Sequence, residues 1–242
     1  MTHAKMDVEL LAVGAREFDL DLSPAQLDQF ARYADLLIDW NLRFNLTSIV
    51  DPRDIVIKHF LDSLSAIRSI PPGAIKLIDV GAGAGLPGLA IKLARPEISL
   101  TLLEATRKKC DFLKAVIADL QLTDVQVVNA RAEEAGRLAE HREQYDIAIA
   151  RAVADLPVLI EYLLPFVKIG GFALAQKSRE AEDELERADT AILLLGGLGS
   201  GVVHVKVPGL NDERALILVE KISATSSDYP RRTGVPIKKP LI

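Results

Sequence analysis

The chain has 242 residues, 49% of them hydrophobic, and a formal net charge of −5 at pH 7. This length suits one substantial α/β domain with an appendage rather than two full domains. A single cysteine, Cys110, excludes a disulfide framework, and the four histidines are too scattered for the usual metal-ligand spacings. The N-terminal stretch carries acids throughout, and no apolar run reaches the roughly 20 residues of a membrane span. We therefore expect a soluble, cytoplasmic protein that binds neither a metal nor a membrane. Our working expectation for its oligomeric state, which the sequence itself does not give, is a monomer.

The charges are distributed unevenly along the chain. A negative total argues against nucleic-acid binding through bulk positive charge. However, residues 221–242 hold one acid, Asp228, and five basic residues, which are Lys221, Arg231, Arg232, Lys238 and Lys239. This stretch therefore has a net charge of +4, which leaves −9 for the remainder of the chain. Any polyanion would be met locally, by a small basic patch.

The region before residue 73 has the spacing of helices. Ser23-Pro24 is a helix start, and apolar residues follow at intervals of three and four over residues 27–38. Asp51-Pro52 begins a second helix, on whose apolar face His59 lies. A histidine in this position is commonly buried and hydrogen-bonded; lining a substrate site is the alternative.

From residue 76 the pattern alternates between strands and helices. Strands are predicted at 76–80, 98–103, 125–129, 145–150, 171–176, 201–207 and 214–221, and helices at 86–95, 107–120, 132–139, 155–167 and 179–195. Such alternation predicts a parallel sheet with right-handed crossovers. The connection 208–213 is too short for a helical crossover, so the final strand should be antiparallel to its neighbour. A seven-stranded sheet that closes with a hairpin is typical of Rossmann-like methyltransferases, whereas a dinucleotide domain would begin a second mononucleotide half.

A glycine turn follows the first predicted strand. Gly81, Gly83 and Gly85 alternate there, and helical spacing begins directly afterwards. Glycine lets the backbone approach a ligand closely, and the amides at a helix start favour polar or anionic groups. Glu104 ends the next strand, where a carboxylate can accept from both ribose hydroxyls. The spacing of Gly83, Gly85 and Gly88 also satisfies the dinucleotide pattern, so the turn alone does not separate a dinucleotide from S-adenosylmethionine.

Two further groups follow strands at the same edge of the sheet, where ligands collect in open α/β folds. The Ala132 backbone and the Glu133 carboxylate suit an adenine amino group, although an acid there can equally stabilise the helix dipole. Arg151 suits a cofactor carboxylate or a substrate phosphate, with a surface ion pair as the alternative. Cys110 is expected to be a packing residue.

The end of the chain, residues 229–240, combines a tyrosine, four cations and several prolines. We expect the prolines to prevent helix and sheet in this stretch. An extended cationic segment can follow the phosphates of RNA, which makes an RNA-contacting arm one interpretation. A solvated, frayed terminus is the other.

Six motifs occur together in the chain. They are WNLRFNLTSI (40–49), KHFLDSL (58–64), IDVGAGAGLPGLAIKLARPE (78–97), RAEE (131–134), RA (151–152) and YPRRTGVPIKKPL (229–241). In combination they resemble the bacterial rRNA small subunit methyltransferase G family, also called glucose-inhibited division protein B. The resemblance runs from about Asp39 to the C-terminus.

The resemblance implies an α/β fold, the Rossmann-like seven-stranded class I S-adenosylmethionine-dependent methyltransferase fold, with an N-terminal helical extension. It implies methyl transfer from S-adenosylmethionine to N7 of one guanine in 16S ribosomal RNA, with that RNA or the small ribosomal subunit as partner. The positions assigned to cofactor binding are Gly81, Gly83, Leu86, Glu104, Ala132, Glu133 and Arg151. As RNA contacts we infer His59, Arg231, Arg232, Lys238 and Lys239.

The sequence also fits the chemistry of this target. Guanine N7 carries a lone pair and no proton, so its methylation needs no general base, and the sequence offers no obvious one. An Asn/Asp-Pro-Pro-Tyr motif, which exocyclic-amine methylation would suggest, is absent after the fourth strand, where Arg151-Ala152-Val153 stands instead. The alternatives are an NAD-type oxidoreductase and a non-catalytic RNA-binding or ribosome-assembly protein.

We expect the chain to be organised in three parts. Residues 1–72 form a helical extension packed on the core, residues 73–223 form the Rossmann-like methyltransferase core, and residues 224–242 form a basic C-terminal tail.

Overall fold

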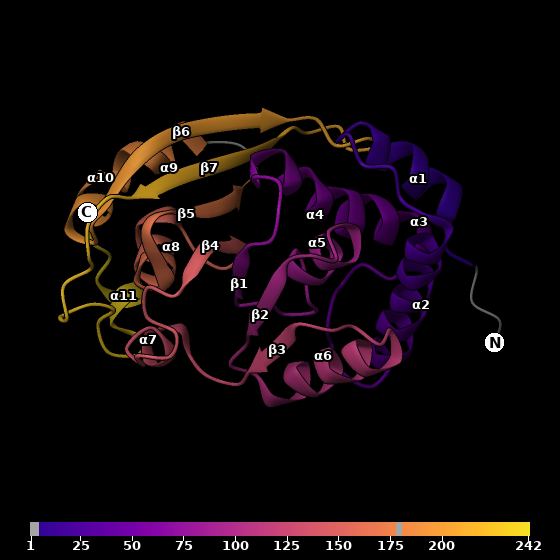
Figure 1. Cartoon of the computed structure of the whole chain (residues 1–242), viewed down its shortest axis with the longest axis horizontal. Helices are drawn as coiled ribbons and strands as arrows, with labels where there is room; N and C mark the ends of the chain where they lie inside the picture. Colours follow the sequence, from indigo (N-terminus) through magenta and orange to yellow (C-terminus); the bar gives the residue numbers. More distant parts are fainter. Residues whose placement is uncertain (1–4, 178–180) are drawn as a thin grey trace.

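The computed structural model describes residues 5–177 and 181–242. Seven strands form one sheet in the order β3-β2-β1-β4-β5-β7-β6. They are β1 Lys76–Val80, β2 Ser99–Leu103, β3 Val125–Val128, β4 Tyr145–Arg151, β5 Val167–Lys177, β6 Gly197–Val205 and β7 Arg214–Lys221. The first five strands are parallel, and β7 is antiparallel to both β5 and β6. The predicted seven-stranded α/β sheet with a closing hairpin is therefore confirmed (Figure 1).

Helices cover both faces of this sheet (Figure 1). One face carries α1 Val8–Arg16, α2 Pro24–Asn41, α5 Gly88–Ala94, α6 Arg107–Asp119 and the segment that runs from α3 Pro52–Asp54 through the π-helical η1 Ile55–Leu61 and α4 Asp62–Leu64 to η2 Ser65–Ser69. The other face carries α7 Ala132–Ala135, α8 Leu156–Leu163, η3 Leu164–Phe166, α9 Ala181–Arg187 and α10 Asp189–Leu194. Each face of the sheet thus has its own hydrophobic core.

The central strands serve both cores because successive side chains of a strand point to opposite faces. Leu77 of β1 and Ile147 of β4 are partners in register, and both belong to the core that includes α2 and α5. The next pair, Ile78 and Ala148, belongs to the core that includes α8. Burial on both faces explains why these strands are apolar almost throughout.

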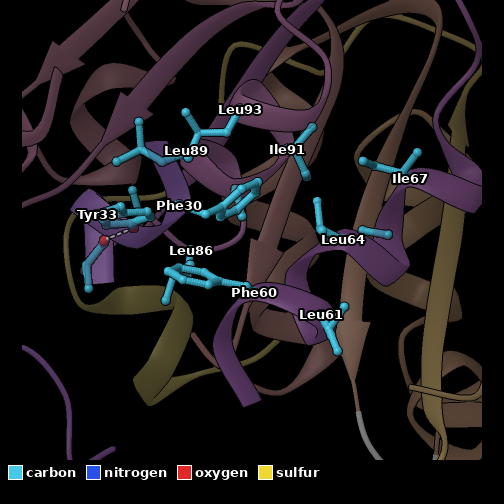
Figure 2. Packing of buried hydrophobic residues seen from close by; sticks show 14 of the residues in the cluster. Phe30, Tyr33, Phe60, Leu61, Leu64, Ile67, Leu86, Leu89, Ile91 and Leu93 are labelled. Atoms are coloured by element: carbon cyan, nitrogen blue, oxygen red, sulfur yellow. Dashed lines mark hydrogen bonds between the residues drawn. The ribbon is translucent and has the colours of Figure 1, made fainter. Parts of the chain in front are cut away.

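Aromatic rings join the N-terminal helices to the glycine turn (Figure 2). Phe30 and Tyr33 of α2 pack on Phe60 of η1, with ring centroids 5.0 and 5.3 Å apart. The hydroxyl of Tyr33 donates a hydrogen bond to the carbonyl oxygen of Ala84 at 2.5 Å. All three rings are fully buried. The N-terminal helices therefore hold the glycine turn as well as covering the sheet.

Two features of the N-terminal region differ from the prediction. Helix α1 was not predicted, because its apolar stripe is narrow: Leu11 and Ala15 are buried, whereas Val13 is half exposed and Glu9 is exposed. Asp7 caps this helix by accepting a hydrogen bond from the amide of Leu10 at 2.9 Å. The helix predicted from Asp51 does begin there, but it winds as a π-helix over Ile55–Leu61. Spacing of apolar residues does not distinguish this rare winding from an α-helix.

Several boundaries in the second half of the chain also differ. The helix predicted at 132–139 ends at Ala135, and the side chain of Arg142 takes up the freed Gly136 carbonyl at 3.0 Å. Strand β5 begins at Val167 and not at 171, and β6 begins at Gly197 and not at 201. Both strands contain glycines beside register shifts, and the predicted strands covered only the residues after those shifts.

The helix predicted at 179–195 is present as two helices, α9 and α10, separated at Ala188. Residues 178–180, which include its predicted start, lie outside the described residues. The expectation that prolines prevent a helix in the last residues was wrong, because α11 Val235–Lys238 forms there. Pro236 lies in its first turn, where a missing N–H costs no helical hydrogen bond.

Within residues 5–177 and 181–242, no helix combines the length and apolarity needed to cross a membrane. The same residues contain no group of three or more His, Cys, Asp or Glu side chains arranged to hold a metal ion. Cys110 is fully buried.

Candidate functional site

A pocket of about 370 Å³ lies at the carboxyl ends of the central strands. We call it the first pocket. It is lined by Val80, Gly81, Leu103, Glu104, Ala105, Thr106, Ala130, Arg131, Ala132, Glu133, Val153, Tyr162, Thr233, Gly234 and Ile237. These residues follow β1, β2, β3 and β4, with α8 and the C-terminal tail completing the wall. This is the edge at which open α/β sheets bind ligands.

The glycine turn forms the floor of the first pocket. Gly81 has φ +77°, and a Cβ atom on it would lie 2.9 Å from the side chain of Val153. Its amide and that of Ala82 both donate to the carbonyl of Leu103, at 2.8 and 3.0 Å. Glycine is therefore required at position 81 both by the backbone conformation and by the close approach of the loop after β4.

Glu104 is one of two acids that line this pocket, and it is only 6% exposed. Its Oε2 accepts from the amide of Gly83 at 2.9 Å, and its Oε1 accepts from the amide of Thr106 at 2.7 Å. A carboxylate can accept about four hydrogen bonds, so both oxygens keep capacity for ribose hydroxyls. A turn that admits no side chain, beside a carboxylate fixed by two amides, fits the ribose of a nucleoside cofactor.

Glu133 is also buried, and it faces the C-terminal tail. Its Oε1 accepts a hydrogen bond from the amide of Gly234 at 2.9 Å. Burial, followed by the nearby charge of Glu133, raises the pKa of Tyr162 to about 12. Glu133 therefore has two protein neighbours at the pocket wall, one from the tail and one from α8.

A second pocket of about 510 Å³ lies beside the first. It is lined by Thr47, Ser48, Ile49, Lys58, His59, Asp62, Arg151, Ala152, Gln176, Lys177 and Arg214. Ala152 lines the second pocket and Val153 lines the first, so the loop after β4 separates the two. A still larger hollow of about 1000 Å³, between α1 and the β6–β7 connection, contains none of the predicted site residues.

Asp62 is the centre of the second pocket. Its Oδ2 accepts from Arg151 Nη1 and its Oδ1 from Arg214 Nε, each at 2.6 Å. Gln176 Nε2 donates to the backbone carbonyl of Asp62, also at 2.6 Å. Arg151 in addition donates to the carbonyl of Lys58 at 3.1 Å. One buried carboxylate thus fixes two guanidinium groups in the wall of this pocket.

His59 is buried in the same wall. Burial, with the nearby Arg151 charge as the second cause, lowers the pKa of His59 to about 4, so the ring is neutral near pH 7. Its Nδ1 lies 3.3 Å from the carbonyl of Lys58, which only accepts, so we assign the ring proton to Nδ1. Its Nε2 then accepts from the hydroxyl of Thr47 at 2.9 Å. Both ring nitrogens therefore form hydrogen bonds within the protein.

The cations of the tail have different surroundings. Arg231 forms an ion pair with Glu161 of α8, a residue with no exposed surface, at 2.6 Å. Arg232, Lys238 and Lys239 are exposed. Arg231 thus has a charge partner in the body of the protein, whereas the other three side chains face solvent.

The chain is similar to known proteins over almost its whole length. The family model described as rRNA small subunit methyltransferase G matches residues 26–217. The chain belongs to the rRNA small subunit methyltransferase G family. A member from Roseiflexus castenholzii is 48% identical over 97% of this chain and 99% of its own length, and one from Desulforamulus reducens is 41% identical over 96% and 97%. This is a family of methyltransferases, so the NAD-type oxidoreductase is not favoured.

The fold agrees with this family. A crystal structure of Aeropyrum pernix fibrillarin with natively bound S-adenosyl-L-methionine superposes with a TM-score of 0.51. It covers 66% of this chain and 72% of the fibrillarin chain, at 15% sequence identity. At that identity the likeness concerns the fold alone, and it supports the predicted class I methyltransferase architecture.

The structure brings together most, but not all, of the residues assigned to the cofactor. Four of them line the first pocket: Gly81, Glu104, Ala132 and Glu133. Gly83 meets this group through its hydrogen bond to Glu104. Leu86 is buried in the core that includes α2 and α5, and it lines neither pocket. Arg151 lines the second pocket, as does His59, one of the inferred RNA contacts.

Sequence reasoning missed Asp62, Arg214, Tyr162 and Ile237, all of which line one of the two pockets. A usable signal existed for Asp62, since KHFLDSL places an acid among the buried residues of a helical segment. An acid in that position needs a cationic partner. Arg214 and Ile237 carry no such local signal, because distant parts of the chain bring them to the site.

Proposed function

We propose that the chain transfers a methyl group from S-adenosylmethionine to N7 of a guanine in 16S ribosomal RNA. Membership of the rRNA small subunit methyltransferase G family supports the substrate class. The observation that carries the choice of atom is the second pocket, in which Asp62 is held between Arg151 and Arg214. The acceptor beside the cofactor therefore has to react without a free base from these residues.

The first pocket holds the nucleoside part of the cofactor in this proposal. Glu104 accepts from the ribose hydroxyls, and the turn at Gly81 lets the backbone lie against the ligand. S-adenosylmethionine, when bound, supplies an activated methyl group on a positively charged sulfur. The chain fixes the direction of that methyl group by holding the nucleoside end, and the loop after β4 borders both pockets.

The second pocket receives the guanine. The described carboxylate and imidazole of its wall are already engaged: Asp62 with two arginines, His59 with Thr47 and Lys58. Guanine N7 presents a lone pair without a proton, so it needs no base. An exocyclic amine or a ribose hydroxyl must lose a proton and would need one. The pocket therefore suits N7 better than other nucleophilic atoms of RNA.

The charge of the second pocket suits a nucleotide. Two lysines of its wall are paired outside the Asp62 cluster, Lys58 with Asp54 at 2.8 Å and Lys177 with Glu184 at 2.7 Å. Two guanidinium groups against the single carboxylate of Asp62 leave a net positive charge. Such a charge draws in a phosphate, which positions the nucleotide that carries the target base.

Because side chains do not enter the deep, narrow major groove of A-form RNA, the target guanine has to lie in a loop or leave its stack. We further propose that the chain works as a cytoplasmic monomer without a metal, on 16S RNA or the small ribosomal subunit. The division into residues 1–72, 73–223 and 224–242 remains our working proposal for its parts. Two hydrogen bonds connect these parts near the proposed cofactor site. Tyr33 of residues 1–72 bonds to Ala84, and Gly234 of residues 224–242 bonds to Glu133.

The test is methyl transfer from S-adenosylmethionine labelled in its methyl group to 16S RNA and to small ribosomal subunits that lack the modification. We expect label in the RNA of at least one substrate, and calorimetry should give binding of S-adenosylmethionine but not of NAD. Cofactor binding without label in either substrate would contradict the proposal and favour a non-catalytic RNA-binding protein. Preferential binding of NAD would instead support the alternative that the chain is an NAD-type oxidoreductase.

A further inference from the structure

The C-terminal tail, residues 224–242, is fastened to the body by arginine side chains. Arg142 donates to the carbonyls of Thr225 and Tyr229, at 2.6 and 2.8 Å. Arg137 donates to the carbonyls of Asp228 and Pro230, at 2.9 and 2.8 Å. Backbone carbonyls held in this way fix the path of a segment that has almost no regular secondary structure.

Arg231 completes the attachment. Its Nε and Nη2 donate to the two oxygens of Glu161, at 2.9 and 2.6 Å, and its own amide donates to Glu161 Oε1 at 2.7 Å. Glu161 has no exposed surface, so Arg231 is its charge partner inside the protein. The tail is therefore anchored as far as residue 231, which excludes a frayed terminus up to that point.

Beyond this anchor the tail reaches the first pocket. Thr233, Gly234 and Ile237 line the same pocket as Gly81 of the glycine turn. The hydrogen bond from Gly234 to Glu133 is buried in part, and Thr233 reaches Glu134 only at 3.3 Å on the surface. The side chain of Ile237 lines the pocket yet is 65% exposed. An apolar side chain at the mouth of a pocket gains if a ligand covers it.

We propose that the tail is a wall of the cofactor pocket, in which Ile237 contacts the adenine, and that it links cofactor binding to RNA binding. The inference rests on the proposed function. Glu104 fixes the ribose, so the base extends toward Ala132 and Glu133, where the tail lies. A bound base covers Ile237 and holds α11 in place.

The link to RNA follows from the position of the cations. Lys238 and Lys239 are exposed and directly follow Ile237, and Arg232 lies just before the residues that line the pocket. A cofactor that holds these residues in one conformation lowers the ordering cost of binding a phosphate chain with them. The two ligands then favour each other, and linkage requires the effect to be equal in both directions.

Limited trypsin digestion of the full chain, read by mass spectrometry, tests the contact. The Arg232–Thr233 and Lys238–Lys239 bonds should be cut more slowly when S-adenosylhomocysteine, the demethylated product, is bound. The Lys206–Val207 bond, which lies at neither pocket, is the internal control and should be cut at an unchanged rate. Equal cleavage of the two tail bonds with and without the ligand would overturn the proposal.

A matched pair of variants tests the role of Ile237. Ile237→Ala should weaken S-adenosylhomocysteine binding about tenfold in calorimetry, because it removes apolar surface that the base would cover. Ile242→Ala is the control, since that side chain is 80% exposed and lines neither pocket. Both side chains are largely exposed, so both variants should fold. Equal affinity of the two variants would contradict the contact.

The link to RNA is measured with unmodified 16S RNA as the probe. S-adenosylhomocysteine should tighten RNA binding at least about fivefold in the wild type. The double variant Lys238→Gln, Lys239→Gln should retain its affinity for S-adenosylhomocysteine and lose most of that effect. An effect of equal size in the variant would overturn the link. A chain that binds no S-adenosylhomocysteine contradicts the proposed function, whereas binding without tail protection contradicts only the inference about the tail.

Discussion

Asp62 and Arg151 are joined by a hydrogen-bonded ion pair of 2.6 Å, although 89 residues separate them in the sequence. Asp62 belongs to the helical segment after α3, and Arg151 ends β4. The pair therefore ties the N-terminal region to the edge of the sheet where the two pockets meet. Because Asp62 also binds Arg214 of β7, it sets the positions of two cations at once.

Asp62→Asn should damage both stability and catalysis. The Asp62 side chain is 6% exposed. When asparagine replaces it, the negative charge is lost, and Arg151 and Arg214 lose their charge partner. We expect a loss of about 3 kcal/mol in the free energy of unfolding, measured by denaturant titration. Methyl transfer, measured at denaturant concentrations where the variant is still folded, should also fall. Asp54→Asn, which breaks the exposed pair with Lys58, is the control and should cost less than about 1 kcal/mol.

Glu104→Ala should act on cofactor binding. The change removes the acceptor for the ribose hydroxyls and also releases the amides of Gly83 and Thr106. We expect the affinity for S-adenosylhomocysteine to fall at least about 30-fold in calorimetry, the size of one or two charged hydrogen bonds. Glu140→Ala, a change at an exposed acid outside both pockets, should leave it unchanged. Unchanged affinity of the Glu104→Ala variant for S-adenosylhomocysteine would show that Glu104 does not bind the cofactor.

Tyr33→Phe tests whether the N-terminal helices support the turn. The variant keeps the ring contacts with Phe60 and loses only the hydroxyl that bonds to the carbonyl of Ala84. A buried carbonyl without its partner should cost about 1–2 kcal/mol of stability. Affinity for S-adenosylhomocysteine should fall about three- to tenfold, because the glycine turn is held less firmly. A variant with reduced stability and unchanged affinity would assign Tyr33 a purely structural role.

Asp79 should make stability depend on pH. Burial, opposed in part by the amide of Gly88, raises the pKa of Asp79 from 3.8 to about 7. Between about pH 4 and 7 the native protein then holds a proton that the unfolded chain has released. The stability contributed by neutral Asp79 is therefore complete below about pH 4 and is lost as the pH rises to about 7.

His59 acts in the opposite direction. Burial lowers the pKa of His59 from 6.5 to about 4, so its contribution to stability grows as the pH rises through that window. The difference in unfolding free energy between wild type and Asp79→Asn cancels the histidine, which both proteins share. That difference should shift in favour of the variant as the pH rises from 4 to 7, by at most about 1.4 kcal/mol per unit. A difference that stays flat over this window would exclude a raised pKa for Asp79.

The features that sequence could predict are those with local signals. The turn at Gly81, Gly83 and Gly85, the acid at 104 and the closing hairpin each depend on residues close together in the chain. Their spacing constrains the backbone directly, and the structure has them where they were predicted. The first residues of β5 and β6 were not predicted because each strand contains a register shift beside its glycines, which interrupts the regular strand pattern.

The remaining features depend on long-range contacts. Arg151 was predicted to bind a cofactor carboxylate or a phosphate. Its partner Asp62 could not be predicted, because only the packing of the N-terminal segment on the sheet brings the two residues together. The pairing of Arg231 with Glu161 could not be predicted from the tail sequence, because Glu161 lies 70 residues away. Glu161 is the one charged residue in the α8 sequence LPVLIEYL, and a lone acid on such a helix is a signal for a buried partner.

The most direct test of the account is the chemical position of the methyl group. Unmodified 16S RNA is incubated with the protein and S-adenosylmethionine, then reduced with borohydride and treated with aniline, which cleaves RNA at N7-methylguanosine. The account predicts cleavage at a guanine, dependent on cofactor and reduced in Asp62→Asn. Methyl label in the RNA without such cleavage, carried instead by an exocyclic amine or a ribose hydroxyl, would contradict it. Such a product requires a base that the pocket around Asp62 and His59 does not supply.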